Sequence, residues 1–485
     1  MNVAQIPNWI GGKQCSPSAS RWIEKYNPHS GELLCLVADS CAKDCQTAVS
    51  AAAAAFPAWA ATPPVRRGQM LSALAALMRE RARELAECIA VETGKPLADA
   101  EGEVSGATLQ AEFFAGEGMR LYARSLTSAI PGKSSHTVRQ PHGVAALIVP
   151  ANTPIANIAW KVFPALICGN TVVLKASEDA PRIAYMFARL TQEAKLQDGI
   201  FNMVQGQAEA GAALVDNPQV SVISFTGSTA VGKKIAETAG RRLARVSLEL
   251  GGKNAFVVCD DADMEKALHW ASLSAFSNAG QRCAAGSRLI IFNSVYEEFR
   301  DKLVRKANAL RLGIAPGCDL GPVVSAKQHK MVLEAIGRAA EAGGRVLCGG
   351  GPPALAELEG GCYVRPTLIE GLAPEDPLSQ EEIFGPVAAL YRVGNLEEAL
   401  CLANATEYGL TAAIHTGSVD RAMWFAQRVK AGVANVNMGT YGSEPHMPFG
   451  GFGLSGNGTR EPGVEALDVY SELKNISFLT RDDRI

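Results

Sequence analysis

One of the twelve cysteines lies in a setting that suits a nucleophile. Cys283 ends the segment Asn-Ala-Gly-Gln-Arg-Cys, which begins at Asn278 and follows a predicted helix. The thiolate is the reactive form of cysteine, and a neighbouring cation such as Arg282 lowers the pKa of a thiol. The sequence therefore predicts a low-pKa thiolate nucleophile on a loop. An inert structural cysteine is the alternative for this residue taken alone.

A carboxylate suited to acid–base chemistry stands at the end of an apolar strand. Glu249 lies between Leu248 and Leu250 and is followed by Gly251 and Gly252. Apolar surroundings penalise the charged form of a carboxylate, so its pKa should rise and allow it to act as a general base near neutral pH. A capping or salt-bridged glutamate is the alternative interpretation.

An asparagine held between two prolines is a candidate oxyanion donor. Asn152 lies between Pro150 and Pro154, which restrict the backbone on both sides. Its side-chain amide can donate to a developing negative charge, and loss of one such donor typically costs roughly 3–4 kcal/mol of activation free energy. A turn-forming asparagine is the commoner use of this residue beside proline.

A strand-to-helix loop has the glycines of a dinucleotide site. The apolar strand that ends at Phe225 is followed by Gly227 and Gly232, with a helix expected to start near Val231. Glycines let a backbone approach a pyrophosphate, and a helix N-terminus offers free N–H groups to it. The spacing departs from the GxGxxG pattern, so an ordinary turn is the alternative.

A second loop carries charges where nucleotide sites form. Lys175 ends an apolar strand and Glu178 follows three residues later. The carboxyl end of a parallel strand is the usual place for a nucleotide, and Glu178 could accept both hydroxyls of the adenosine ribose. That arrangement favours NAD, because a carboxylate would repel a 2′-phosphate. A solvated loop with ordinary charges is the alternative.

Repeated strand–helix units must position these groups. Continuous apolar strands that alternate with helical patterns indicate parallel, doubly wound sheets with helices on both faces. The pattern restarts after Gly251 and continues to about Gly450, which predicts a second α/β domain. A last strand at 471–479 has no helix after it and must pair with another element, such as a second subunit. The expected strands include 144–149, 172–175, 201–204, 220–225, 254–258 and 287–292; the expected helices include 101–124, 183–194, 264–277 and 295–310.

Bulk composition excludes several classes of function. The 485 residues predict two or three domains. Because 46 Lys and Arg face 49 Asp and Glu, a net charge of −3 gives no reason to expect nucleic acid or an anionic membrane as a partner. No apolar stretch approaches the roughly 20 residues of a membrane span, and no secretory signal is apparent, so a cytoplasmic protein is expected. CxxC spacings are absent, so no metal is expected, and most cysteines should be buried hydrophobes.

Together, these motifs resemble the aldehyde dehydrogenase superfamily. The resemblance rests on their order and spacing and runs from Asn27-Pro-x-Ser-Gly31 to the last strand. The matching segments are Asn152, Lys175-Ala-Ser-Glu178, Phe225-Thr-Gly-Ser228, Glu249-Leu-Gly-Gly-Lys253, Gly280-Gln-Arg-Cys283, Glu381-Glu-Ile-Phe-Gly-Pro-Val387 and Pro448-Phe-Gly-Gly-Phe-Gly-Leu-Ser-Gly456.

The resemblance implies a role for each matching position. Cys283 would be the nucleophile, and Asn152 with the backbone N–H of Cys283 the oxyanion hole. Glu249 would be the base for the deacylating water, with activation of the thiol as a further role, since the site must either lower the thiol pKa or transfer its proton to a base. Lys161 and Glu461 would relay the proton from the base to solvent. NAD, with NADP as the alternative, would contact Lys175, Ser177, Glu178, Thr226, Gly227, Ser228, Leu250, Glu382 and Phe384. The substrate wall would include Thr153, Asn157, Trp160, Arg282, Tyr441 and His446.

The resemblance also implies an architecture. The expected fold is α/β and aldehyde dehydrogenase-like, with two doubly wound domains and a small β oligomerisation arm. Residues 1–120 and 143–250 would form the Rossmann-like cofactor domain, and 251–450 the catalytic domain. Residues 121–142 and 465–485 would form the arm of a homodimer or homotetramer.

The chain departs from the family pattern at the substrate wall. The family's Trp-Asn-Phe-Pro appears as Ala151-Asn-Thr-Pro154, so a small polar residue replaces an aromatic one. Thr153, Asn157 and Arg282 are polar where an apolar aldehyde would need apolar contact. Arg282 could pair with a substrate carboxylate, which suggests α-ketoglutaric or succinic semialdehyde; lowering the thiol pKa or supporting the loop is the alternative. The segment from Ser455 to Glu461 is also one residue longer than the family form.

Three other functions are alternatives to the aldehyde oxidation that the resemblance implies. A CoA-acylating dehydrogenase of the same fold would not need the water-activating base that Glu249 suggests. A non-catalytic binding or structural member would be expected to lack the nucleophile, yet Cys283 is present. A zinc alcohol dehydrogenase would need ligand spacings that this sequence does not offer.

Overall fold

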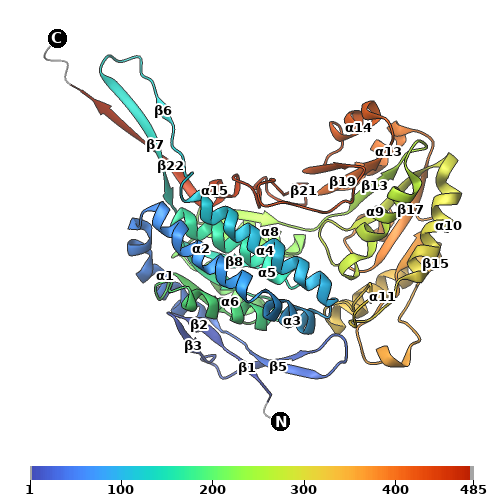
Figure 1. Cartoon of the computed structure of the whole chain (residues 1–485), viewed down its shortest axis with the longest axis horizontal. Coiled ribbons are helices and arrows are strands. Elements are labelled where there is room, and N and C mark those ends of the chain that lie inside the picture. The colour runs from blue at the N-terminus through green and yellow to red at the C-terminus, as the bar shows by residue number, and fades with distance from the viewer. Residues whose placement is uncertain (1–2, 481–485) are drawn as a thin grey trace.

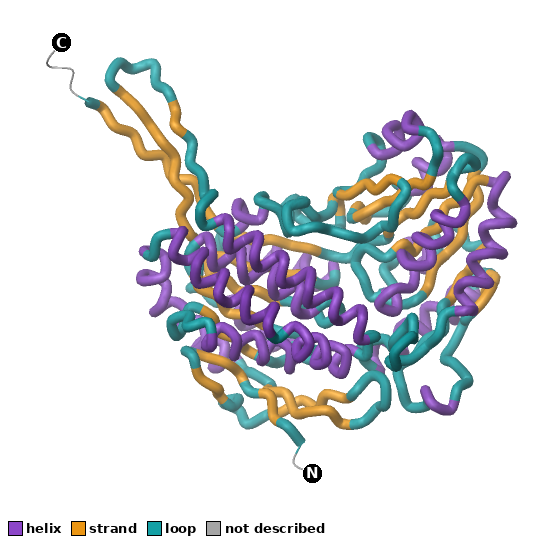
Figure 2. The backbone as a smooth tube through the Cα atoms, viewed as in Figure 1, coloured by secondary structure: helices purple, strands orange, loops and turns teal. Residues whose placement is uncertain are grey.

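The chain folds into two α/β bodies and a projecting β arm (Figure 1). The computed structural model describes residues 3–480. The first two residues of the expected cofactor domain and residues 481–485 of the expected arm lie outside the described residues. The expected α/β class with parallel-stranded sheets is confirmed, and helices cover both sheets (Figure 2).

The first body is built on a seven-stranded sheet with the order β12-β11-β8-β9-β10-β2-β3. The first five of these strands are parallel, and the two N-terminal strands close one edge in antiparallel pairing. The strands are β2 (Asn8–Ile10), β3 (Lys13–Cys15), β8 (Val144–Ile148), β9 (Thr171–Lys175), β10 (Phe201–Val204), β11 (Val220–Thr226) and β12 (Arg245–Glu249). Strand β8 is buried along its whole length, which explains its continuous apolar sequence.

Helices form one core on each face of this sheet. One face packs against α2, α3, α4, α5 and α6, and the other against α7, α8 and part of α1. The helices are α1 (Ala42–Ala61), α2 (Pro64–Glu80), α3 (Ala82–Thr93), α4 (Leu97–Glu117), α5 (Pro154–Cys168), α6 (Pro181–Glu193), α7 (Ala208–Asp216) and α8 (Thr229–Gly240). A small sheet of β1 (Gln5–Ile6), β5 (Leu33–Ala38) and β4 (Trp22–Tyr26) lies beside this body.

The second body repeats the plan with the strand order β15-β16-β17-β14-β13-β19-β20, parallel except for β15. Its strands are β13 (Asn254–Val258), β14 (Gly286–Phe292), β15 (Arg345–Cys348), β16 (Thr367–Glu370), β17 (Val387–Val393), β19 (Thr411–His415) and β20 (Val433–Val436). One core includes α9 (Met264–Phe276) and α10 (Asn293–Ala309). The other includes α11 (Ala326–Glu341), α13 (Leu396–Ala403) and α14 (Val419–Ala426).

The arm is a three-stranded antiparallel sheet with the order β22-β7-β6. It contains β6 (Ser125–Leu126), β7 (Lys133–Pro141) and β22 (Ser471–Leu479), and the long pairing runs from Ser471 opposite Pro141 to Leu479 opposite Lys133. The short helix α15 (Ala466–Val469) and Tyr470 are buried in the first body's core instead. The C-terminal part of the arm therefore begins at Ser471 rather than at residue 465.

Most predicted elements are present within a few residues of the expected bounds. β10, β13 and β22 have the expected bounds, whereas α4 ends at Glu117 instead of Arg124. Helix α8 begins at Thr229, two residues before the expected start near Val231, and Gly232 lies inside the helix. A Cβ at Gly232 would lie 2.5 Å from the Leu250 side chain, so this glycine permits close helix–strand packing. No helix within residues 3–480 is long and apolar enough to cross a membrane.

Candidate active site

A cavity of about 290 Å³ lies where strand ends of the two bodies meet. Its wall contains the candidate nucleophile, the candidate base and the candidate oxyanion donor from three separate segments of the chain. Most of the residues predicted from the sequence line it: Asn152, Thr153, Asn157, Trp160, Thr226, Gly227, Ser228, Glu249, Leu250, Cys283, Glu382 and Phe384. Trp160 packs against Phe449 with a ring-centroid distance of 5.5 Å, which forms an aromatic side of the cavity.

A strained loop presents Cys283. Asn278, Ala279 and Gly280 have φ angles of 55°, 55° and 67°, in the left-handed region that costs energy for residues with a side chain. The loop packs so closely that a Cβ at Gly280 would lie 2.0 Å from the Gly385 carbonyl oxygen. This contact joins the Gly-Gln-Arg-Cys motif to the Glu-Glu-Ile-Phe-Gly motif and explains how the surrounding structure sustains the strain.

The Cys283 thiol does not have the low pKa predicted from the sequence. Its pKa is raised to about 12, first by burial and then by the carboxylates of Glu382 and Glu249; the Ala284 N–H and then Arg282 oppose the rise. The prediction weighed the neighbouring cation but not the two carboxylates, which come from other segments. The thiol is therefore neutral in this state, and chemistry requires transfer of its proton to a base or a change in its surroundings.

Glu249 is a buried carboxylate without a hydrogen-bond partner. It ends β12, and within residues 3–480 neither of its oxygens accepts a hydrogen bond. Burial raises its pKa well above the usual range, Glu461 raises it further, and Lys161 and Arg460 oppose the rise. The direction agrees with the sequence-based expectation. An unsatisfied buried carboxylate of raised pKa beside a thiol is suited to accept a proton from the thiol or from water.

Lys161 and Glu461 form a fully buried ion pair behind Glu249. The Lys161 Nζ lies 2.7 Å from Glu461 Oε2, and both side chains are inaccessible to solvent. Ser224 and Ser247 donate to the other carboxylate oxygen at 2.7 and 2.9 Å. The structure thus brings together two residues 300 positions apart that the resemblance paired. Their role in proton transfer remains a prediction.

Hydrogen bonds to both its backbone and its side chain fix Asn152. The carbonyl oxygen accepts from Lys95 Nζ at 2.7 Å and from Asn278 Nδ2 at 3.1 Å. The side-chain amide donates to the Gln281 carbonyl at 3.0 Å, two residues before Cys283. An amide carries two hydrogens, so one N–H remains for an oxyanion. The adjacent Asn157 donates to Thr153 Oγ1 at 2.9 Å, so the polar wall is internally bonded.

The loop after β11 fits a dinucleotide at the edge of the cavity. Ser228 is the N-cap of α8 and makes no side-chain cap bond, which leaves the first N–H groups of this twelve-residue helix available to an anion. Glu382 accepts from the Gly252 N–H at 3.2 Å, and a Cβ at Gly251 would lie 2.3 Å from its carboxylate. Burial raises the pKa of Glu382 to about 7, while the Gly252 N–H and Lys253 oppose the rise.

The expected adenosine contacts lie at the carboxyl end of β9, outside the lining of this cavity. Lys175 Nζ and Glu178 Oε2 are 3.4 Å apart, and Ser177 Oγ accepts from the Asp179 N–H at 3.2 Å. Burial lowers the pKa of Lys175, and Glu178 opposes that shift. Lys175 and Glu178 thus lie at the carboxyl end of β9, in the same sheet as the strands that reach the cavity, as the sequence predicted.

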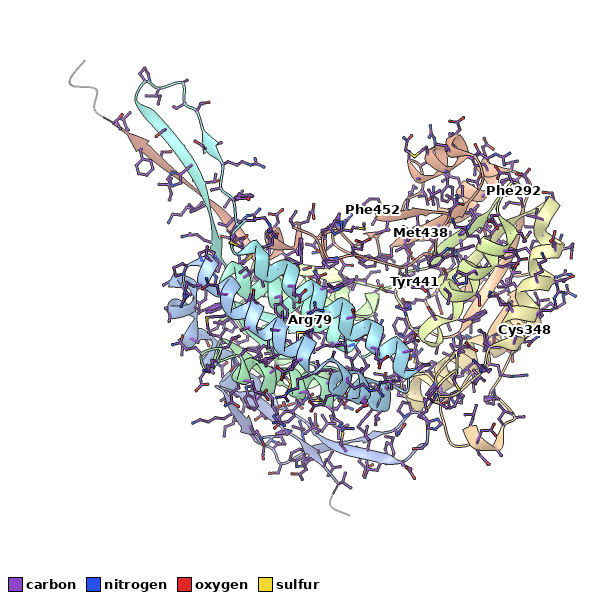
Figure 3. The ribbon with its side chains drawn as sticks, viewed as in Figure 1. Arg79, Phe292, Cys348, Met438, Tyr441 and Phe452 are labelled. Carbon is purple, nitrogen blue, oxygen red and sulfur yellow. The ribbon has the colours of Figure 1, made fainter. Side chains whose placement is uncertain are left out.

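Three expected substrate residues do not line the cavity. Arg282 donates to Ser277 Oγ at 3.1 Å and stacks on the Tyr441 ring at 4.7 Å from its centroid. Tyr441 contacts the small apolar cluster that contains Phe449, and Figure 3 places it at the junction of the two bodies. The His446 side chain is 59% exposed. These residues lie beyond the cavity wall, because their own stacking and loop contacts hold them there.

Sequence reasoning missed several residues of the site. Phe449, Met331 and Gln328 line the cavity, and Lys95 contacts Asn152 from the loop between α3 and α4. The Thr-Gly-Lys-Pro turn that contains Lys95 was the available signal. A lysine in a turn is usually solvated, so this segment alone does not place Lys95 at the site.

Comparison with known proteins gives consistent matches over nearly the whole chain. Residues 15–476 match the model of the aldehyde dehydrogenase family. The chain is 38% identical over 472 residues to an alpha-ketoglutarate semialdehyde dehydrogenase of Haloferax volcanii, covering 97% of this chain and 98% of the relative. It is 37% identical over 468 residues to a succinate-semialdehyde dehydrogenase (NADP+) of Escherichia coli, covering 96% of each. The crystal structure of betaine aldehyde dehydrogenase from Staphylococcus aureus in complex with NAD+ superposes with a TM-score of 0.96 at 29% identity, covering 99% and 96% of the two chains.

The raised thiol pKa predicts slow alkylation of Cys283 in the cofactor-free enzyme. Because the pKa is about 12, the iodoacetamide rate at Cys283 should rise about tenfold per pH unit from pH 7 to pH 10 without a plateau. Peptide mass spectrometry would follow Cys283, with the exposed Cys401 as an internal reference for reagent and unfolding. A plateau below pH 9 at Cys283 would contradict the neutral resting thiol.

Proposed function

The chain belongs to the aldehyde dehydrogenase family, and we propose that it oxidises a carboxylate-bearing semialdehyde through a thioester on Cys283. NAD(P)-dependent oxidation of an aldehyde to an acid is the activity of this family member. The assignment of residues rests on one observation: a single cavity holds a thiol, a carboxylate with two unsatisfied oxygens and a donor amide. Cofactor binding is assigned to the body on the first sheet, and presentation of the nucleophile to the second.

The first half-reaction forms the carbon–sulfur bond. The Cys283 thiol gives its proton to a base as its sulfur adds to the aldehyde carbon, and the carbonyl oxygen becomes an alkoxide. The free N–H of Asn152 and the backbone N–H of Cys283 stabilise that charge, a contribution worth roughly 3–4 kcal/mol per donor. The bound nicotinamide cofactor supplies the acceptor for the hydride that leaves the carbon. A thioester on Cys283 remains.

The second half-reaction hydrolyses the thioester. Glu249 removes a proton from water, the hydroxide adds to the thioester carbon, and the thiol leaves as the acid forms. The raised pKa of Glu249 makes it a stronger base once ionised. The Lys161–Glu461 pair behind it offers a buried route for the proton away from the cavity. A CoA-acylating enzyme would not require this arrangement, so hydrolysis is the favoured outcome.

The polar wall supports a substrate with a carboxylate. Within residues 3–480 the terminal NH₂ groups of Arg282 make no hydrogen bond, because only its Nε is engaged with Ser277. Arg282 does not line the cavity itself, but it adjoins Cys283 and stacks on Tyr441, so its free donors would meet the carboxylate of a substrate that extends from the cavity toward that ring. Thr153 and Asn157 add polar contacts. The two relatives named for semialdehydes agree with this substrate class.

NAD is the proposed cofactor, with NADP as the alternative. Glu178 lies beside Lys175 at the strand end where the adenosine ribose would bind, and its carboxylate favours ribose hydroxyls over a 2′-phosphate. The NAD+ complex of the Staphylococcus aureus enzyme supports this choice, whereas the Escherichia coli relative is named for NADP+. All twelve cysteines are free, which suits the proposed reducing cytoplasmic setting.

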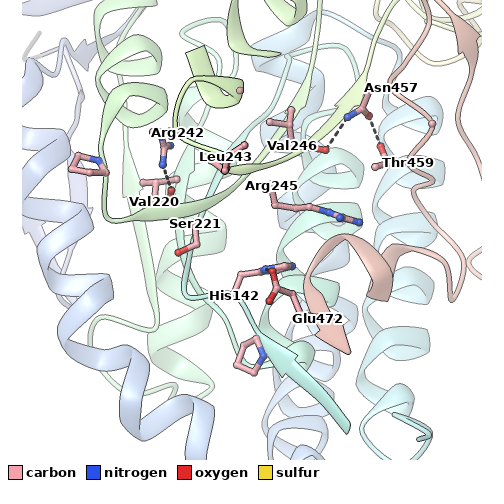
Figure 4. A pocket seen from close by; sticks show the side chains of 15 residues that line it. His142, Val220, Ser221, Arg242, Leu243, Arg245, Val246, Asn457, Thr459 and Glu472 are labelled. Carbon is pink, nitrogen blue, oxygen red and sulfur yellow. Dashed lines mark hydrogen bonds and ion pairs between the residues drawn. The ribbon is translucent and has the colours of Figure 1, made fainter. Parts of the chain in front are cut away.

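The arm supports a homodimer or homotetramer. β22 is an edge strand with an unpaired side, and it exposes Leu473, Phe478 and Leu479. β20 is likewise the open edge of the second sheet. At the base of the arm lies a groove of about 950 Å³, where His142 contacts Glu472 at 3.1 Å (Figure 4). Edge strands with apolar side chains are typical of a surface that a second copy covers.

Charge on the arm should therefore dissociate the enzyme. The double substitution Leu473→Glu and Leu479→Glu places two carboxylates on β22 and should reduce the mass in sedimentation equilibrium to that of the monomer. Leu355→Glu, at an exposed position on the second body, serves as the control for added charge. An unchanged assembly in the arm variant, or a wild type that is already monomeric, would contradict the proposal.

Arg282→Leu should change substrate preference. Reduced nicotinamide would be followed with succinic semialdehyde, α-ketoglutaric semialdehyde and propanal. The variant should raise KM for both semialdehydes about 10- to 100-fold, since a charge-assisted bond to a carboxylate is worth about 1.5–3 kcal/mol, and leave propanal within about twofold. An equal effect on propanal would show that Arg282 supports the loop instead.

Cys283→Ser provides the matched control for chemistry in the same panel. It should abolish turnover of every aldehyde while retaining cofactor binding by fluorescence quenching. Turnover by this variant would refute the nucleophile assignment. Turnover that needs added CoA would favour the acylating alternative, and no turnover of any aldehyde by the wild type would favour a non-catalytic member.

A further inference from the structure

We propose that Lys95, through a buried ion pair with Glu103, is a positioning residue for the oxyanion donor Asn152. The inference rests on the proposed function, since it assumes that the Asn152 amide contacts the reacting oxygen. It assigns a purpose to a charged pair that lies outside the predicted catalytic set and does not line the cavity.

The Lys95–Glu103 pair is enclosed within the first body. Lys95 lies in the turn between α3 and α4, Glu103 lies on α4, and their charged atoms are 2.7 Å apart. Each side chain is only 4% exposed. Burying two charges is costly, and such a pair is often no more stabilising than apolar side chains of similar size. A benefit other than stability is the better explanation for its presence.

Within residues 3–480, the side-chain hydrogen bonds that the pair makes to other residues all go to the Asn152 segment. Lys95 Nζ donates to the Asn152 carbonyl at 2.7 Å, and Glu103 Oε1 accepts from the backbone N–H groups of Ile155 and Ala156 at 3.0 and 3.4 Å. Those two N–H groups belong to the first turn of α5 and would otherwise lack partners. The pair therefore holds the residues on both sides of Thr153 and Pro154, so it fixes where the segment enters α5.

The second body holds the same segment from the opposite side. Asn278 Nδ2 donates to the Asn152 carbonyl at 3.1 Å, and the Asn152 amide donates to the Gln281 carbonyl at 3.0 Å. The turn that carries Lys95 also packs closely against this body. A Cβ at Gly321 would lie 2.1 Å from the Gly94 carbonyl oxygen, so only glycine fits there. Lys95 thus ties the position of Asn152 to the nucleophile loop across the junction.

Positioning of this kind affects the rate through geometry. An oxyanion donor must lie about 2.7–3.1 Å from the developing charge, and a displacement of about 1 Å can cost about 100-fold in rate. Removing the Lys95 bond leaves Asn278 as the remaining donor to the Asn152 carbonyl, so the segment should shift rather than unfold. The cost should fall on formation of the oxyanion and not on binding of the cofactor.

A double-mutant cycle tests the inference. Lys95→Met, Asn152→Ala and the double variant would be compared by single-turnover formation of reduced nicotinamide, with whichever of succinic semialdehyde and propanal the wild type oxidises faster. Lys95→Met should lower the rate about 10- to 100-fold and Asn152→Ala about 100- to 1000-fold. The double variant should match Asn152→Ala within about twofold, because Lys95 acts only through Asn152.

Controls separate positioning from folding. Arg79 of α2 forms an ion pair at 2.6 Å with Glu112 of α4, the helix that also carries Glu103, on the outer helical layer (Figure 3). Arg79→Met therefore removes an ion pair of α4 without touching Asn152 and should leave the rate unchanged. Lys95→Arg keeps the charge and should recover at least half of the lost rate on a logarithmic scale. If Lys95→Met does not fold, Glu103→Gln replaces it in the cycle, since it retains an acceptor for α5.

The outcomes separate the positioning role of Lys95 from the proposed function. Multiplicative effects in the double variant, or a Lys95→Met rate equal to wild type, would overturn the positioning role while leaving the proposed function intact. A normal rate in Asn152→Ala would instead refute the oxyanion assignment itself. A Lys95→Met variant whose cofactor dissociation constant rises in proportion to its rate loss would also overturn the inference.

Discussion

The site depends on the hydrogen bonds that Asn152 makes across the junction of the two bodies. Its carbonyl oxygen accepts from Lys95 of one body and Asn278 of the other, and its amide reaches the Gln281 carbonyl. The donor amide and the nucleophile adjoin strands of different sheets, so their separation depends on how the two bodies meet. The left-handed residues before Cys283 are sustained because Gly280 packs against Gly385 at the same place.

Burial gives the same site its acid–base character. The cavity withdraws Glu249, Glu382 and Cys283 from water, and the pKa of each rises as a result. At rest Cys283 is therefore a neutral thiol, and its proton has still to be transferred to a base. The ionised form of Glu249 is then a stronger base than an exposed carboxylate, and the Lys161–Glu461 pair provides a charged neighbour that solvent does not screen.

The features of the molecule that depend on local sequence pattern could be predicted from the sequence. Local sequence patterns predicted β10, β13 and β22 with their observed bounds, and the order of the motifs predicted which distant residues meet. Long-range electrostatics were not predictable in the same way. The low pKa expected for Cys283 was wrong because Glu249 and Glu382 approach it only after folding. Lys95 was missed for a related reason, since its partners Glu103 and Asn152 are supplied by tertiary structure.

The covalent intermediate is the central claim, and mass spectrometry of a trapped enzyme tests it most directly. Glu249→Gln and the wild type would each be mixed with NAD+ and succinic semialdehyde, or with propanal if the semialdehyde is not a substrate, and quenched in acid within one turnover; the wild type is included because the variant loses the burst if Glu249 is also the base for the thiol. The account predicts a burst of reduced nicotinamide and a Cys283 peptide heavier by the acyl group of the product. A burst with unmodified Cys283, or an acyl group on another residue, would contradict it.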